Sequence, residues 1–294
     1  MNPRPWRQVN VAFSDWASAE RSALAHLAAL LGTAETEGLV TCWFFIRKAP
    51  CWRVRYLPGA HAAAAQAYLH RHFEDLTSKR HVDKVTEVVY EPETHAFGGT
   101  EAMASAHRLF HLDSRHLLAH LTDTQRQPGN GHRRELSIIL CSTLLRAAGL
   151  DWYEAGDVWA RVAEHRELPE QIPADRLHTL QTDLRRLMSV DTASLMREGA
   201  PLAFAAEWTM AYAAAGRELA NLATDGLLHR GLRAILAHHI IFAWNRHGLP
   251  YPTQTVLAHT AKTVVFGPDP TANHQAKPEG QQWTSAYRWT SGSR

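Results

Sequence analysis

The chain has 294 residues, and its 31 basic and 29 acidic side chains leave a formal net charge of +2. Apolar residues make up 45% and charged residues 20%, which is typical of globular proteins and excludes a disordered or collagen-like chain. Coating of nucleic acid needs a clustered basic excess, so the near balance of charge argues against a nucleic-acid partner. Histidine (19) and tryptophan (10) are both frequent.

The first 99 residues predict a small mixed sheet with helices. In chain order we expect a strand at 6–13, a helix from 14 or 15 to about 31, strands at 39–47 and 52–57, a helix at about 60–77 and a strand near 84–91. This order is that of a ferredoxin-like α+β unit. The two central strands form a hairpin that presents Arg53 and Arg55 on the same side.

Beyond Gly99 the periodicity is helical throughout. The expected helices lie near 100–110, 113–122, 133–148, 151–165, 173–197, 203–224, 228–247 and 252–265, and the segment 127–131 is the clearest break. From residue 267 onward Pro, Gly, Ser, Thr and Gln dominate, as in a loose tail. The sequence therefore predicts a sheet region at 1–99, a helical region at 100–266 and a tail at 267–294.

Cysteine usage and the start of the chain predict a cytoplasmic protein. Cys42, Cys51 and Cys141 form no disulfide framework and no CxxC pair, which favours a reducing compartment. The first residues lack the apolar core of a signal peptide. No apolar run reaches the ~18 residues of a membrane span, so we expect no membrane partner.

The hairpin carries the densest arginine cluster. Arg47, Arg53 and Arg55 interleave with aromatic residues that include Trp52. A rigid row of guanidinium groups can bind carboxylates or peptide carbonyls. The alternative is a solvated strand face on which the arginines cover the aromatics.

His107, His111 and Asp113 have a spacing that metal ligands also use, because residues four apart share a helix face. The glutamate of an HExxH motif is missing, however. Asp113 and Ser114 are more simply explained as the N-cap of the next helix. We therefore expect no metal.

The segment 238–246 combines His238, His239, Asn245 and Arg246 on an otherwise apolar helix. An imidazole beside an amide or a guanidinium suits proton transfer near neutral pH. The alternative is a core histidine followed by an ordinary helix end. No phosphate-binding loop, GxGxxG or GxSxG motif appears, so we expect no cofactor.

Several blocks, in order, resemble the thiopeptide-type bacteriocin biosynthesis family. That family is similar to the C-terminal, glutamate-eliminating domain of nisin-type lantibiotic dehydratases, and the resemblance covers about 6–266. The blocks are WFFIR at 43–47, WRVR at 52–55, YEPET at 90–94, FGG at 97–99, LF at 109–110, DS at 113–114, RELS at 134–137, GLDW at 149–152 and WNR at 244–246.

The resemblance implies one of two activities. One is the removal of glutamate from glutamylated Ser or Thr, and the other is a formal [4+2] aza-cycloaddition of two dehydroalanines that makes a pyridine and closes a macrocycle. Eliminating domains usually have histidine, arginine and histidine where Cys51, Ala96 and Ile241 stand here. These departures favour the pyridine synthases. A non-catalytic subunit that binds leader peptide is a further alternative.

The resemblance also implies partners and residue roles. The partners would be a modified precursor peptide with its leader, dehydratase or azole-forming enzymes of the pathway, and a second copy of the chain. His239, then His238, would move the proton that creates the azadiene, and Arg53, Arg55 and Arg246 would stabilise developing negative charge. The remaining candidates are Asn245, Tyr90 and Tyr153 for catalysis and Arg47, Trp52, His111 and Trp244 for substrate binding.

Overall fold

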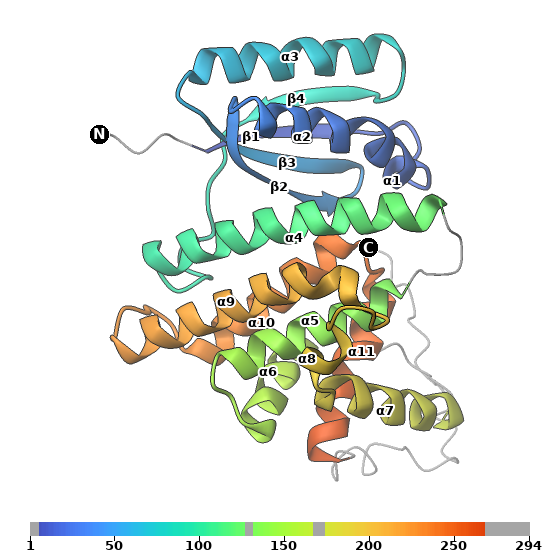
Figure 1. Cartoon of the computed structure of the whole chain (residues 1–294), viewed down its shortest axis with the longest axis vertical. Helices are drawn as coiled ribbons and strands as arrows, with labels where there is room; N and C mark the ends of the chain where they lie inside the picture. Colours follow the sequence, from blue (N-terminus) through green and yellow to red (C-terminus); the bar gives the residue numbers. More distant parts are fainter. Residues whose placement is uncertain (1–5, 127–131, 167–173, 268–294) are drawn as a thin grey trace, which may run out of the picture.

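The computed structural model describes residues 6–126, 132–166 and 174–267 (Figure 1). The predicted break at 127–131 lies outside the described residues, and so does all of the predicted tail except residue 267. Among the described helices, none combines the length and the apolar character needed to cross a membrane.

The N-terminal sheet has the ferredoxin-like order β2-β3-β1-β4, as the sequence predicts. All three strand pairs are antiparallel, so the expectation of a mixed sheet is wrong in that detail. Its strands alternate between an apolar face and a more polar one, which is the pattern of a sheet with two different neighbours. The strands are β1 (Arg7–Ala12), β2 (Val40–Lys48), β3 (Cys51–Pro58) and β4 (Lys84–Val88).

Helices cover the apolar face of the sheet. Val9 of β1 and Val54 of β3 are buried there against Leu27, Leu69 and other aliphatic side chains of the covering helices. The first covering helix passes through one π-helical stretch without interruption. The elements are α1 (Ala19–Ser22), the π-helix Ala23–Leu27, α2 (Ala28–Thr36) and α3 (Ala62–Ser78).

The long helix α4 (Thr100–Arg126) covers the outer edge of β2, between the sheet and the remaining helices (Figure 1). The Trp43 N–H donates to Nδ1 of His111 (3.2 Å), and the Phe45 N–H donates to Oγ of Ser114 (3.4 Å). An edge strand needs such partners for its outward N–H groups.

The sequence predicts two helices here, with Asp113 as a cap, and this is wrong. Asp113 and Ser114 lie inside one continuous helix, and both are fully buried. Partners from distant helices engage the Asp113 carboxylate, so it does not compete with the local backbone for hydrogen bonds.

The remaining helices pack beneath α4 (Figure 1). The predicted helix 173–197 is divided, because Asp191 starts a new helix by accepting a hydrogen bond from the Ala193 N–H (3.1 Å). The helices are α5 (Arg133–Ala147), α6 (Trp152–Glu164), α7 (Ala174–Ser189), α8 (Thr192–Leu195), the 3-10 turn Ala203–Ala205, α9 (Ala206–Thr224), α10 (Leu232–His247) and α11 (Tyr251–Phe266).

A glycine turn at 98–99 ties the sheet region to α10. The His229 N–H donates to the Gly98 carbonyl (2.9 Å), and Arg230 donates to the Ala96 carbonyl (3.3 Å). Gly98 has φ +90°, and a Cβ there would lie 2.3 Å from Cδ1 of Ile235. Only glycine fits both restrictions. The turn thereby fixes Phe97 in the interior.

Candidate functional site

The hairpin arginines lie on the polar side of the sheet. Arg55 is opposite Gln8 on one neighbouring strand, and Arg53 is opposite Asn10. We call these four residues the polar sheet face. The expectation that Arg53 and Arg55 share one side is confirmed. Arg53 is partly exposed, whereas Arg55 is buried.

Arg55 is held from three directions. Its Nε donates to Oε1 of Gln8 (2.7 Å), and its guanidinium carbon lies 4.6 Å from the ring centre of Tyr90 and 5.3 Å from that of Phe44. Burial lowers the pKa of Arg55, while the nearby Tyr90 and Glu93 oppose that effect. The result is a fixed cation at the floor of the face.

Tyr90 and His107 form a hydrogen-bonded pair beside this cation. The Tyr90 hydroxyl lies 2.8 Å from Nε2 of His107, and the Trp6 ring covers the imidazole at 4.3 Å. Burial, followed by the charge of Arg55, lowers the pKa of His107 to about 4. Burial also raises the pKa of Tyr90 far above its usual range. Both side chains are therefore uncharged at neutral pH.

A surface hollow of about 530 Å³ reaches His107 of this pair. Trp6, Cys42, His107 and His111 contribute to its lining. Burial raises the pKa of the Cys42 thiol to about 12, so this cysteine is no nucleophile at neutral pH. The hollow gives a peptide access to His107 from the edge of the sheet.

An aromatic layer separates the polar sheet face from α10. The layer consists of Phe44, Phe97, Phe110 and Phe242. Phe110 is in ring contact with the other three, and Phe97 also contacts Phe242, at centroid distances of 5.0–5.6 Å. Tyr90 and Ala96 pack at the margin of the same cluster. The layer excludes water between the sheet and the helices.

His239 and Arg246 lie together on the far side of this layer. The His239 ring is 4.9 Å from that of Phe97, and the Arg246 guanidinium is 4.4 Å from the Phe110 ring centre. Both residues are almost completely buried, and within the described ranges both ring nitrogens of His239 have no hydrogen-bond partner. Burial lowers the pKa of His239 to about 3, which makes it a weak base.

Asp113 is a buried residue to which the sequence assigned only a capping or ligand role. Its carboxylate accepts hydrogen bonds from Nε of Arg246 (2.5 Å), Nε1 of Trp208 (2.7 Å) and the Tyr212 hydroxyl (2.8 Å), with Nε2 of His247 at 3.2 Å. Arg246 and His247 hold the pKa of Asp113 well below its usual range, against desolvation. The signal in the sequence for this buried group of hydrogen-bonded side chains around Asp113 is an acidic residue on the apolar stripe of α4.

Arg47 lies on the opposite face of the sheet from the other two hairpin arginines. Its guanidinium stacks on Trp52 (4.5 Å) and pairs with Glu20, which Arg133 also engages. Arg47, Trp52 and Asn245 line one small cavity on this face. Asn245 also accepts a hydrogen bond from Gln254 (3.2 Å). The structure thus places Arg47, Trp52 and Asn245 away from the polar sheet face.

The other predicted residues are dispersed. Trp244 is buried and stacks on Trp159 (5.9 Å). His238 is half-buried, with Nδ1 3.2 Å from the Ala234 carbonyl. Tyr153 is 66% exposed on α6. His111 bonds to the backbone of β2, and its Nε2 is 3.6 Å from Glu35.

His107, His111 and Asp113 do not converge. The first bonds to Tyr90, the second to Trp43 and the third to Arg246. In the part of the chain that the structure describes, no group of three or more His, Cys, Asp or Glu side chains could hold a metal ion.

Comparisons with known proteins agree with this architecture. A model of the lantibiotic biosynthesis dehydratase C-terminal family matches residues 6–265. No curated protein sequence matches the chain.

Solved structures that share the fold include the following three. The tRNA-dependent lantibiotic dehydratase MibB from Microbispora sp. 107891 is 16% identical with a TM-score of 0.62, over 94% of this chain and 29% of that one. TsrL is 15% identical with a TM-score of 0.62, and the match covers 90% of this chain and 99% of TsrL. TbtD, the pyridine synthase of thiomuracin biosynthesis, is 14% identical with a TM-score of 0.56, and the match covers 89% of this chain and 97% of TbtD.

The chain spans less than a third of the length of MibB. The family match nevertheless includes the hairpin, the glycine turn and α10, which together build the polar sheet face and the aromatic layer. The chain belongs to the lantibiotic biosynthesis dehydratase C-terminal family.

Proposed function

We propose that the chain is a cofactor-independent pyridine synthase that acts on a modified precursor peptide. It would join two dehydroalanines of that peptide in a formal [4+2] aza-cycloaddition and then release water and the leader peptide. The name of TbtD as a pyridine synthase supports this choice. The name of MibB, a dehydratase, supports the alternative of glutamate elimination.

The observation that carries the proposal is the aromatic layer. An eliminating site needs a cation for the departing glutamate and a base for the α-proton. Where the resemblance places an arginine and a histidine, this chain has Ala96, which packs against the aromatic cluster, and Ile241, which packs against the main core. At these two positions the aromatic layer and the main core therefore take the place of the cation and the base that elimination needs.

The first step would be a proton transfer. One amide of the peptide must become an imidic acid before it can act as an azadiene. The Tyr90 hydroxyl can donate a proton to the amide oxygen while His107, reached through the hollow, accepts one from the amide nitrogen. Arg55 lies against the Tyr90 ring and would stabilise negative charge on that oxygen.

The later steps need no cofactor. Two C–C bonds form: one joins the β-carbons of the two dehydroalanines, and the other joins the former amide carbon to the α-carbon of the second dehydroalanine. Proximity within one chain supplies most of the acceleration. The former amide carbon then loses its oxygen as water, and the leader leaves as a carboxamide, so no oxidant is required. Arg53, partly exposed beside Arg55, would bind a carboxylate of the peptide.

His239 remains a second proposal for proton transfer. Its burial behind Phe97 and its low pKa favour His107 over it. His239→Ala and His238→Ala variants that both kept full turnover would remove these two histidines from the mechanism.

Incubation with two peptides tests the proposal. A peptide with two dehydroalanines should lose water and its leader, and a glutamylated peptide should remain unchanged. Release of free glutamate from the second peptide would instead identify an eliminating lyase. If both peptides bound and neither changed, the chain would be a non-catalytic leader-binding subunit.

A further inference from the structure

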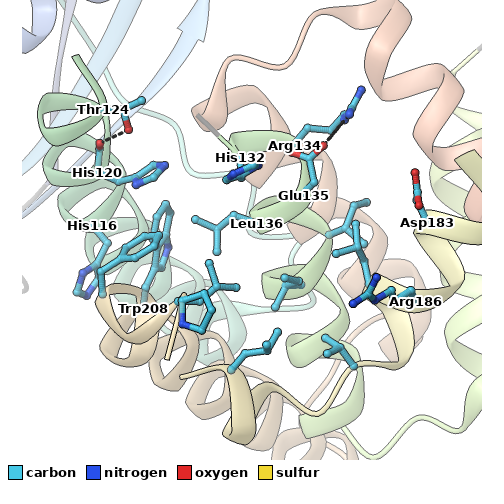
Figure 2. A pocket seen from close by; sticks show the side chains of 18 of the residues that line it. His116, His120, Thr124, His132, Arg134, Glu135, Leu136, Asp183, Arg186 and Trp208 are labelled. Carbon is cyan, nitrogen blue, oxygen red and sulfur yellow. Dashed lines mark hydrogen bonds and ion pairs between the residues drawn. The ribbon is translucent and has the colours of Figure 1, made fainter. Parts of the chain in front are cut away.

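A second cavity, of about 920 Å³, lies among the helices away from the polar sheet face (Figure 2). It opens between α4, α5, α7 and the start of α9. Its floor is aliphatic and includes Leu136, Ile139, Leu184 and Leu187. Cavities of this size and character bind small organic groups.

One wall of the cavity is built from two stacked ring pairs. His116 lies nearly parallel to Trp208 (17°, 6.0 Å), and His120 lies parallel to Phe204 (3°, 5.1 Å). Burial lowers the pKa of both imidazoles, so they are uncharged at neutral pH. Figure 2 shows His116, His120 and Trp208 together on one side of the cavity, opposite Arg186 and Asp183. The wall therefore presents flat, neutral rings.

The wall is rigid on one side and exposed on the other. Trp208 is fixed because its Nε1 donates to the buried Asp113 carboxylate (2.7 Å). Phe204, in contrast, leaves 55% of its surface in solvent at the edge of the cavity. Nε2 of His120 is buried without a hydrogen-bond partner among the described residues. A large ring left in water and an unpaired imidazole nitrogen both favour an occupant.

The charges around the cavity favour an uncharged occupant. Arg134 pairs with its neighbour Glu135, and Arg186 is balanced by Asp183 on the same helix. Asp123 also contributes to the lining, so there is no basic excess for an anion. A flat, uncharged ring with one hydrogen-bonding atom matches the stacked wall, the aliphatic floor and the Nε2 of His120.

We propose that this cavity is a second binding site that takes an uncharged aromatic or heteroaromatic ring. Only the source of the ring rests on the proposed function: a ring-bearing segment of the modified peptide would dock here while its dehydroalanines lie at the polar sheet face. Such a subsite would select peptides that already carry flat rings.

Calorimetric titration with naphthalene-1-carboxamide tests the site without any turnover. We expect binding, and about five-fold weaker binding of the saturated analogue decahydronaphthalene-1-carboxamide, because the saturated rings cannot stack on the wall. Phe204→Leu should weaken the binding of naphthalene-1-carboxamide about five-fold. Met210→Leu, at a similarly exposed side chain of the same region, should leave its affinity unchanged.

A blocking variant controls for binding elsewhere. Ala119 lies at the cavity surface between His116 and His120, and it is exposed, so Ala119→Trp can fill the cavity without disturbing the core. We expect it to abolish binding of the probe. Absent binding, equal affinity for the saturated analogue, or affinity unchanged in Ala119→Trp would each overturn the proposal. None of these results depends on whether the chain makes a pyridine, so the two proposals fail separately.

Discussion

The hydroxyl of Tyr90, just after β4, lies 2.8 Å from Nε2 of His107 on α4. The sheet region and the first long helix thus each supply one member of the pair that we propose transfers the proton. Arg55 lies against the Tyr90 ring and keeps the pair next to a positive charge. Neither member is charged at neutral pH, so the Tyr90 hydroxyl keeps its proton and the His107 ring keeps an unprotonated nitrogen.

Loss of the Tyr90 hydroxyl should slow turnover with little effect on folding. Tyr90→Phe keeps the ring contacts with Arg55 and Phe44 but removes the proton donor. We expect kcat on a peptide with two dehydroalanines to fall by about 10²-fold. Tyr68→Phe is the matched control, since Tyr68 belongs to α3 on the other side of the sheet. Equal rates in the two variants would contradict the role of Tyr90.

Arg53 should act on substrate affinity. Arg53→Gln removes the partly exposed cation but leaves the buried Arg55 in place. We expect KM for an acidic precursor to rise about five- to ten-fold, with a smaller change in kcat, and the difference to shrink at high salt. Arg71→Gln, at an exposed position of α3, should change neither value. An unchanged KM in Arg53→Gln would contradict this prediction.

Asp113 should be important for stability. Asp113→Asn leaves the fully buried Arg246 without a counter-charge, and breaking a buried pair costs about 3–5 kcal/mol. Asp157→Asn breaks partly exposed pairs with Arg161 and Arg233 and should lower the free energy of unfolding by only about 1 kcal/mol. Urea denaturation of both variants measures the difference. Similar costs would show that the Asp113 centre contributes no more than a surface ion pair.

The buried His239 should make stability fall in mild acid. Its pKa is about 3 in the native state and about 6.5 when unfolded, so between these values only the unfolded chain binds the proton. Stability is therefore lost as the pH falls below about 6.5. At pH 5 the loss from this group amounts to about 2 kcal/mol.

Comparison of variants isolates the contribution of His239. Urea denaturation measures the free energy of unfolding at pH 7 and pH 5. Between these pH values it should fall by about 2 kcal/mol less in His239→Leu than in the wild type. His70→Gln, at an exposed site of α3, should retain the wild-type loss. A loss in His239→Leu as large as that of the wild type would refute the assignment.

The Gly98 turn should tolerate no side chain. Gly98→Ala combines a left-handed backbone with a Cβ 2.3 Å from Ile235. We expect it to lower the free energy of unfolding by about 2–4 kcal/mol. Gly226 has φ +70° but open space around it, so Gly226→Ala should cost only about 1 kcal/mol. Thermal unfolding of the two variants separates packing from backbone strain. Equal shifts would mean that contact with Ile235 contributes nothing.

The sheet could be predicted from the sequence because its signals are local. Alternating residues in β1 and β3 and the hairpin spacing are enough to place Arg53 and Arg55 on one face. Hairpin spacing does not show that Arg47 pairs with Glu20, since that partner lies on a different element. The arginines of the polar sheet face could therefore be predicted from the sequence, but the residues that contact them could not.

Interactions between residues distant in sequence could not be predicted. The sequence predicts Asp113 as a helix cap because its partners, Trp208 and Arg246, are 95 and 133 residues away. His107 shows metal-ligand spacing in the sequence, yet Tyr90 binds its imidazole. The stacked wall of the second cavity likewise joins α4 to α9, and no local periodicity reports such a contact.

Mass spectrometry of a dehydrated precursor after incubation with the chain tests the proposed pyridine synthesis most directly. We predict a product that has lost water and its leader as a carboxamide, formed by the wild type and at least 10-fold more slowly by Tyr90→Phe. An unchanged mass with the wild type, or glutamate released from a glutamylated peptide, would contradict the account.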